Sequence, residues 1–214
     1  MKLYALTLSP YAARIRLALR LKGLSYEQEA PPGGGTRSPE YLAINPIGKL
    51  PVLVTDDGLI IAESETIIDY LEDHYPAPSL TPTGDAARVQ MRNAIRTQEL
   101  YAVPAMSRLF AQRNAAVRDD RVVAAELAEL RSGMALLQHF VDDAPYVAGG
   151  AVSKADCLVL PTLMLCGIAG AMFGEPGILG DFPVLTSYVA KARQHPDMGA
   201  IWDETEAALK AMTG

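Results

Sequence analysis

The sequence predicts an α/β domain followed by an all-helical domain. Three observations indicate this: strands and helices alternate as β-α-β-α-β-β-α within residues 1–75, prolines and a glycine interrupt residues 76–85, and only helical patterns follow over residues 86–214. At 214 residues, half of them hydrophobic, the chain suffices for one large or two small domains. Its net charge of −6 argues against a general affinity for nucleic acid or an anionic membrane.

Residues 2–8 form the first predicted strand, and the helix after them begins at Ser9-Pro10. Ser9 is a preferred N-cap residue, Pro10 suits the first helical position, and Gly23 closes the helix. Residues 25–30 give a weaker second strand. The side chains that we expect on the water-facing side of the helix are Arg16, Arg20 and Lys22.

A short helix over residues 39–45 leads into the stretch that the rest of the domain is organised around, residues 45–53 (N-P-I-G-K-L-P-V-L). Pro46 ends the helix, and Gly48 permits a turn that a side chain would obstruct. A cis Leu50–Pro51 bond would turn the Leu50 backbone toward an incoming extended peptide, whereas a trans proline in an ordinary loop is the alternative interpretation. The stretch therefore predicts a bend followed by a strand.

A hairpin and a helix complete the α/β domain. The apolar runs 52–55 and 59–62 flank Asp56-Asp57-Gly58, and an Asp-Gly pair between apolar runs is a strong hairpin signal. Glu63-Ser64 then begins a helix whose apolar side chains recur at helical spacing.

The helical half is expected to begin with one helix over residues 86–114, bent at Pro104. Eighteen uncharged residues, 157–174, reach the length of a marginal membrane span. The preceding Ser153 and Asp156 form a capping box, and an apolar helix is what the centre of a helical domain requires, so we predict a buried core helix. The remaining predicted helices are residues 118–143, 183–194 and 197–211.

Neither the cysteines nor the histidines predict a metal site. Cys157 and Cys166 lie nine residues apart in one apolar segment, and the three histidines are scattered. The short N-terminal apolar run is broken by Ser9-Pro10 and followed by arginines, so we expect no secretory leader and a cytoplasmic protein.

Four motifs together resemble those of the cytosolic glutathione transferases. They lie in the right order along the whole chain: Ser9-Pro10-Tyr11-Ala12-Ala13-Arg14-Ile15-Arg16, Asn45-Pro46-Ile47-Gly48-Lys49-Leu50-Pro51, Glu63-Ser64 with Ile67 and Tyr70-Leu71, and Ser153-Lys154-Ala155-Asp156. The resemblance implies a thioredoxin-like domain (residues 1–75), a linker (76–85), an all-α domain (86–214), glutathione as co-substrate without a metal, a role in detoxification, and a homodimer.

The resemblance also implies roles for individual residues. Ser9 would stabilise the glutathione thiolate, although a plain N-cap would use the same Ser-Pro pair. The glutathione-binding residues would be Tyr11, Lys49, Leu50, Pro51, Glu63 and Ser64, of which Lys49 is equally compatible with a solvated side chain and Glu63-Ser64 with an ordinary helix cap. Tyr101, Met106 and Phe110 could line the pocket of the electrophile or belong to the core.

The activity stays open between three alternatives. Ser9 stands where related reductases have cysteine, which puts mixed-disulfide chemistry in doubt, and Tyr4 is a possible rival for the thiolate-binding role. We expect a transferase that conjugates the glutathione thiolate to small, largely apolar electrophiles. The Arg14-Ile15-Arg16 spacing is similar to the zeta-like isomerases of maleyl compounds, so a glutathione-dependent cis–trans isomerase is the first alternative. A non-catalytic glutathione-binding protein of the same fold is the second.

Overall fold

The computed structural model describes residues 1–141 and 144–213. Contacts between residues divide the chain into two compact units, Met1–Leu80 with Pro196–Gly214, and Thr81–His195. The sequence placed residues 86–214 in one helical domain, whereas contacts group the last helix, α9 (Pro196–Thr213), with the first unit. The domain assignment itself stays a prediction, because a grouping by contacts does not decide it.

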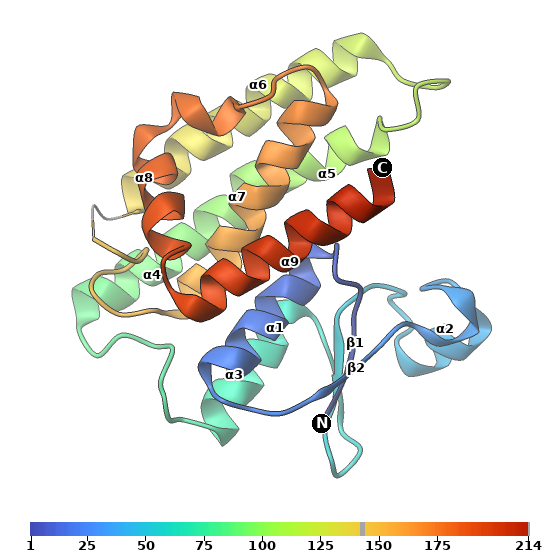
Figure 1. Cartoon of the computed structure of the whole chain (residues 1–214), viewed down its shortest axis with the longest axis vertical. Coiled ribbons are helices and arrows are strands. Elements are labelled where there is room, and N and C mark those ends of the chain that lie inside the picture. The colour runs from blue at the N-terminus through green and yellow to red at the C-terminus, as the bar shows by residue number, and fades with distance from the viewer. Residues whose placement is uncertain (142–143, 214) are drawn as a thin grey trace. The chain divides into compact units, whose positions relative to one another are not determined.

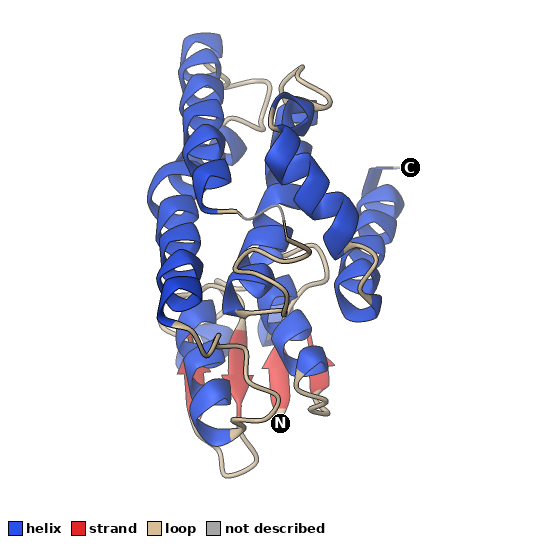
Figure 2. Ribbon diagram, turned by 90° about the vertical axis from the view of Figure 1, so that its left-hand side faces the viewer, coloured by secondary structure: helices blue, strands red, loops and turns tan. Residues whose placement is uncertain are grey.

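The first unit is built on a four-stranded sheet in the order β2-β1-β3-β4. Figure 1 labels β1 and β2, and Figure 2 shows the strands of the sheet in red. Its strands are β1 (Lys2–Tyr4), β2 (Glu27–Glu29), β3 (Val52–Val54) and β4 (Ile60–Ala62). β1 pairs in parallel with β2, as a helical crossover requires, and antiparallel with β3. β3 and β4 form the hairpin that Asp-Gly predicts. The predicted order of elements is therefore confirmed.

Four α-helices and a short 3-10 turn, η1 (Pro32–Gly34), complete the first unit. The helices are α1 (Pro10–Leu21), α2 (Pro39–Ile44), α3 (Ser64–His74) and α9. α1 contacts both α3 and α9, and α3 contacts β3 and β4. The core includes fully buried side chains from α1, β3 and α3, among them Ile15, Leu53 and Ile67, so apolar burial is what holds these elements together.

Two cations that we expected to face water are buried in the first unit. Arg16 is 2% exposed and Lys22 is 6% exposed. The Lys22 ammonium forms an ion pair with Glu72 at 2.5 Å and donates to the carbonyls of Tyr75 (2.7 Å) and Pro78 (3.1 Å). The prediction was wrong because helical periodicity shows which side a residue occupies but not which distant segment covers that side.

The second unit consists of helices. They are α4 (Asp85–Thr97), the π-helical turn η2 (Gln98–Ala102), α5 (Val103–Ala111), α6 (Asp120–Leu137), η3 (Gln138–Phe140), α7 (Lys154–Met172), η4 (Ile178–Asp181) and α8 (Pro183–Ala192). The expected single helix bent at Pro104 is thus interrupted before the proline, by the π-turn η2. The predicted helix over residues 118–143 begins later and ends earlier, and its last two residues lie outside the described residues.

α7 is the core helix of the second unit. Within the described residues it is the helix that is long and apolar enough to cross a membrane, but 72% of its most apolar window is buried inside the protein. Helices α4, α5 and α8 contact it. Asp156 accepts a hydrogen bond from the Ser153 backbone N–H at 2.8 Å, so the predicted capping box is confirmed.

Candidate functional site

The register of the sheet brings three loops to one edge. Tyr4 at the end of β1 pairs with Val52 at the start of β3, and Val52 pairs with Ala62 at the end of β4. The turn after β1, the bend before β3 and the start of α3 therefore leave the sheet at the same edge. We call these segments, Leu6–Ser9, Lys49–Pro51 and Glu63–Ser64, the sheet-edge site.

Ser9 occupies the N-cap of α1 at this edge. Its backbone N–H donates to the Leu6 carbonyl at 2.9 Å, and its hydroxyl oxygen accepts from the Ala12 N–H at 3.2 Å. A serine hydroxyl has two acceptor lone pairs and one donor proton, so this capping bond leaves the proton for another partner. The free N–H groups and the dipole of the helix favour negative charge at the same place. Ser9 is thus suited to hold an anion.

Arg14 ties α1 to the start of α3. Its guanidinium is buried, lies 4.5 Å from the centre of the Tyr11 ring and donates to the Ser64 hydroxyl at 3.4 Å. The predicted residues Tyr11 and Ser64 therefore share Arg14 as a neighbour. We did not assign Arg14 to the site from the sequence; the signal that could have found it is the Arg-x-Arg spacing one turn after Ser9.

The bend before β3 is fixed by two side chains that hold one carbonyl. The Lys49 carbonyl accepts from the Tyr41 hydroxyl at 2.7 Å and from the Asn45 amide at 2.9 Å. Burial raises the pKa of Tyr41, which keeps the phenol protonated as a donor. Gly48 has φ of +63°, where a side chain would be strained. The backbone of this bend is therefore held in place before any ligand arrives.

The Leu50–Pro51 bond, which follows this carbonyl, is cis. Pro51 is buried and Leu50 is half-buried, while the Lys49 side chain is exposed. The cis isomer is thus the one present, and the roles of the Leu50 backbone and the Lys49 ammonium stay predictions.

Glu63, at the N-cap of α3, is the non-glycine residue with positive φ in the described chain, at φ 66° and ψ 124°. Side chains rarely adopt this conformation, and such residues concentrate at functional sites. Glu63 is exposed, while the next residue, Ser64, is buried at the first turn of α3. An exposed carboxylate beside free helix N–H groups can receive both an amine and a carboxylate of one ligand.

The predicted electrophile-pocket residues have different surroundings. Tyr101 is 52% exposed and lines a cavity of about 190 Å³, which we call the π-turn hollow. Its lining is Leu100, Tyr101, Pro104, Arg108, Glu129, Ser132, Gly133 and Leu136. Met106 is only 2% exposed, and Phe110 is half-buried. The assignment of all three to one substrate pocket stays a prediction.

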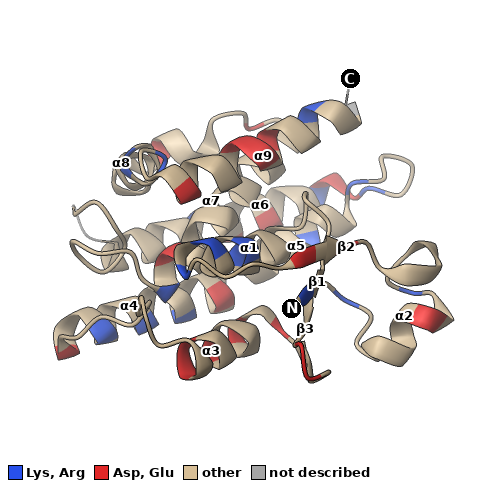
Figure 3. Cartoon of the chain, turned by 60° about the horizontal axis from the view of Figure 1, so that its bottom comes forward, with Lys and Arg blue, Asp and Glu red and all other residues tan. Residues whose placement is uncertain are grey.

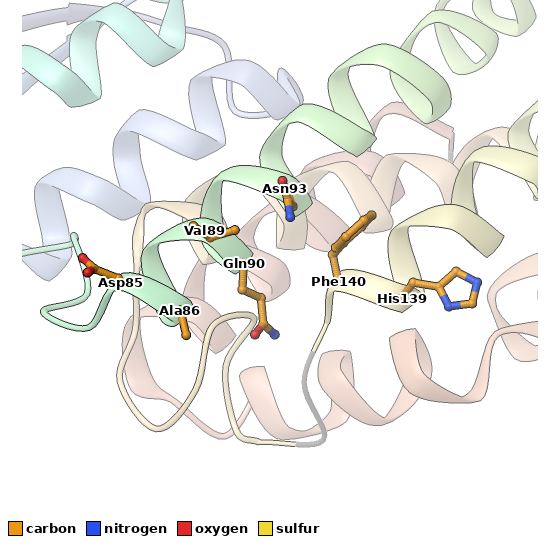
Figure 4. A pocket seen from close by; sticks show the side chains of 7 residues that line it. All are labelled: Asp85, Ala86, Val89, Gln90, Asn93, His139 and Phe140. Carbon is orange, nitrogen blue, oxygen red and sulfur yellow. The ribbon is translucent and has the colours of Figure 1, made fainter.

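A second, more open cavity of about 480 Å³ lies on α4 and η3 (Figure 4). It is lined by Asp85, Ala86, Val89, Gln90, Asn93, His139 and Phe140, none of which the sequence suggested as a site residue. The side-chain amide of Gln90 donates a hydrogen bond to the Val147 carbonyl at 3.0 Å.

In the described residues there is no candidate metal site, and both cysteines are buried. Over residues 1–141 and 144–213, no three His, Cys, Asp or Glu side chains lie close enough to hold a metal ion. Cys157 and Cys166 are both buried, and burial raises the pKa of the Cys166 thiol to about 12. Cys166 is therefore no thiolate nucleophile near neutral pH.

A thioredoxin-like sheet with a helix N-terminus and an ordered proline bend at one edge, joined to an all-helical unit, defines the class of this protein. The model of the N-terminal domain of glutathione S-transferases matches residues 3–79. A glutathione S-transferase of Pseudomonas putida is 28% identical over 212 residues, which cover 99% of this chain and 95% of that protein.

A maleylacetoacetate isomerase of Pseudomonas aeruginosa is 32% identical over 203 residues, which cover 92% of each chain. Among solved structures, a glutathione S-transferase from Methylobacterium radiotolerans in complex with glutathione sulfonate has a TM-score of 0.76 at 25% identity, covering 93% of this chain and 92% of that one. The chain belongs to the cytosolic glutathione transferase superfamily.

Proposed function

We propose that the protein is a glutathione transferase in which Ser9 holds the glutathione thiolate while its sulfur attacks a small electrophile. The observation that carries this proposal is the hydroxyl of Ser9, whose oxygen caps α1 and whose proton is left to donate. The capping bond and the thiolate would use different parts of one hydroxyl. The plain N-cap that the sequence also suggested is therefore compatible with the catalytic role.

The chemical task is to ionise a thiol. A free thiol has a pKa of about 8.5, so roughly 3% is thiolate at pH 7. Lowering the bound pKa by about two units makes the thiolate the main form and corresponds to roughly 2.7 kcal/mol. The thiol proton leaves to solvent, the sulfur forms a bond to the electrophilic carbon, and the leaving group departs with its electron pair.

The rest of the tripeptide would be held by the other segments of the sheet-edge site. The Leu50 backbone, at the bend before β3, would pair with the cysteinyl backbone as an added antiparallel strand. Glu63, Ser64 and the start of α3 suit the amine and carboxylate of the γ-glutamyl end. Tyr11 would border the cleft, and Lys49 would meet the glycyl carboxylate.

The decisive experiment follows the pKa of bound glutathione by thiolate absorbance in Ser9→Ala. We expect that pKa to rise by about two units, and glutathione affinity measured at about pH 5.5, where the bound thiol is mostly protonated in both variants, to change by less than about twofold. Ser38→Ala is a matched control, because Ser38-Pro39 is also a Ser-Pro N-cap and Ser38 accepts from the Tyr41 N–H at 3.1 Å. Binding with an unshifted thiol pKa in the unmodified protein would instead favour the non-catalytic binding protein.

A glutathione-dependent isomerase of maleyl compounds is the second candidate, favoured by the 32% identity with the isomerase of Pseudomonas aeruginosa. In that reaction the thiolate adds to the double bond and leaves again after rotation, so Ser9 would have the same task. Parallel assays of maleyl acids and a chloronitrobenzene separate the two activities. Turnover of the maleyl acids alone would replace the transferase proposal by the isomerase.

The finer expectations of a cytoplasmic homodimer with a role in detoxification also belong to this proposal. Exposed apolar side chains on the second unit outside the π-turn hollow support an assembly, among them Val89, Val117 and Met172. Light scattering of the purified protein should give twice the mass of one chain. The mass of a single chain would contradict the expected homodimer.

A further inference from the structure

Arg16 joins the last helix to the turn that carries Ser9, within the first unit. Its guanidinium is 2% exposed and forms an ion pair with the Glu204 carboxylate of α9 at 2.5 Å. A second nitrogen of the same group donates to the Thr7 carbonyl at 3.2 Å. Figure 3 shows basic residues on α1 and acidic residues on α9.

The Thr7 carbonyl lies inside the turn that ends at Ser9. This turn is closed by the Ser9 N–H, which donates to the Leu6 carbonyl at 2.9 Å. A four-residue turn with one closing bond can still rotate its central peptide, and the bond from Arg16 fixes that peptide relative to α1. The hydrogen bond from Arg16 therefore bears on where the Ser9 hydroxyl points.

Glu204 is what holds the Arg16 guanidinium at this place. A buried guanidinium needs a compensating charge, and the charge-assisted hydrogen bond to that charge also limits the orientation of the guanidinium. One Glu204 oxygen accepts from Arg16 and the other from Arg20 at 2.6 Å. The Arg20 side chain is 29% exposed, whereas the Arg16 side chain is buried and also donates to the Thr7 carbonyl of the turn. The two arginines thus share the Glu204 carboxylate. Among the described contacts, only Arg16 links this carboxylate to the turn, through its hydrogen bond to the Thr7 carbonyl.

We propose that Glu204, acting through Arg16, is a positioning residue for the Ser9 hydroxyl, so that the C-terminal helix sets the ionisation of the bound thiol. The inference rests on the proposed function of Ser9. Small displacements of a group that stabilises charge cost much of its effect, which is why a salt bridge away from the thiol matters. The competing explanation is a purely structural link between α1 and α9, which would change the stability and leave the thiol pKa unaltered.

Glu204→Gln is the primary variant, because Glu204 is 40% exposed while substitution of the buried Arg16 puts folding at risk. We expect the pKa of bound glutathione to rise by about half a unit, which lowers the thiolate fraction about threefold below that pKa. The KM for glutathione should stay within about twofold, because the peptide-binding segments are untouched. Amide exchange at Thr7–Ser9 should become faster.

Two control variants separate positioning from a general effect on α9. Glu206→Gln makes the same change on the same helix, where the carboxylate accepts from the Trp202 indole at 2.8 Å. Arg20→Gln removes the other partner of Glu204 and leaves the bond from Arg16 to Thr7. Both should leave the thiol pKa unshifted. An equal shift in either control would overturn the route through Arg16.

Double variants distinguish failure of this inference from failure of the proposed function. If Ser9→Ala raises the thiol pKa and Glu204→Gln adds nothing in that background, the positioning role is supported. If Ser9→Ala raises it but Glu204→Gln in the unmodified protein does not, the inference fails while the function of Ser9 stands. If Ser9→Ala has no effect, the function proposed for Ser9 fails, and the inference with it.

Discussion

The sheet-edge site and the π-turn hollow differ in what fixes their geometry. At the sheet edge, backbone groups and buried donors determine the positions: Arg14 holds Ser64, and Tyr41 with Asn45 holds the Lys49 carbonyl. In the hollow, the lining residues belong to neighbouring helical segments, and several of them, including Tyr101, are about half exposed.

Under the proposed function, this difference suits the two regions to different recognition tasks. A tripeptide presents the same backbone every time, so a site for it benefits from a rigid arrangement of hydrogen-bonding groups. Side chains on a helix surface can change without disturbing the fold, which suits the recognition of varied apolar molecules. The following predictions test whether the two regions are as independent as this comparison implies.

The largest effect should come from the fully buried Asp156, the anchor of the second unit. Its carboxylate accepts from the N–H groups of Val147 and Ser153, the Ser153 hydroxyl and the Tyr188 hydroxyl. Asp156→Ala should lower the free energy of unfolding by about 3 kcal/mol, because several buried donors lose their acceptor. Denaturant unfolding followed by circular dichroism measures this loss, while KM for glutathione should stay unchanged in the folded fraction.

The pH dependence of Asp156 has a definite sign. Burial raises the pKa of this carboxyl in the folded protein. Its linked stability is therefore complete below the unfolded pKa of about 3.9 and decreases as the pH rises through the folded pKa. Relative to Asp156→Asn, which does not titrate, the unmodified protein should lose stability as the pH is raised through that window. If the unmodified protein instead became more stable relative to Asp156→Asn as the pH rises, the raised pKa would be contradicted.

Gly133→Ala should cause the next largest loss of stability, although replacing an ordinary helical glycine by alanine stabilises a helix. An added Cβ would lie 2.6 Å from the Tyr101 carbonyl oxygen and 2.7 Å from the Ala102 nitrogen, both backbone atoms of η2. We expect a loss of about 1–3 kcal/mol from overpacking. Gly167→Ala on α7 is the matched control, since its Cβ would make ordinary contact with Leu179 at 3.5 Å, and it should gain up to about 1 kcal/mol.

Tyr41→Phe tests the rigidity of the bend before β3. The Lys49 carbonyl would keep the Asn45 amide and lose the phenolic donor, at a cost of about 1 kcal/mol. If the bend binds glutathione, its dissociation constant should rise by up to about fivefold, the same free energy expressed as an equilibrium. Tyr70→Phe, in which the ring stacked on His74 is kept, should leave it unaltered. Equal changes in both variants would exclude a specific role of the bend.

The smallest effect on stability, under about 0.5 kcal/mol, should follow Tyr101→Leu, because the side chain is half exposed. If the π-turn hollow takes the electrophile, KM for the electrophile changes while KM for glutathione does not. Steady-state kinetics with both substrates varied separates the two constants. A change in glutathione KM alone would contradict the independence of the two regions.

Several features were predictable from the sequence because they depend on neighbours in the chain. The Ser-Pro start of α1, the Asp-Gly hairpin and the capping box of α7 are confirmed, since each is decided within a few residues. The same is true of the element order in the α/β part, which apolar periodicity shows.

Features that depend on distant partners were not predictable. Helical spacing placed Arg16 and Lys22 on the water-facing side of α1. In the structure both are buried, and each pairs with a carboxylate that lies 188 or 50 residues away in the chain. The π-turn before Pro104 is likewise a feature that the position of the proline alone does not reveal. The grouping of α9 with the first unit follows from contacts that no local pattern contains.

The sequence by itself determined the type and order of the elements in the α/β part and several of the helix starts, because hydrogen bonding and steric limits act over a few neighbouring residues. Only the tertiary structure decided which charges are buried, which three loops share an edge of the sheet and that Arg16 of α1 pairs with Glu204 of α9. These arrangements need pairs of groups far apart in the chain, and their energies exist only once the chain has folded.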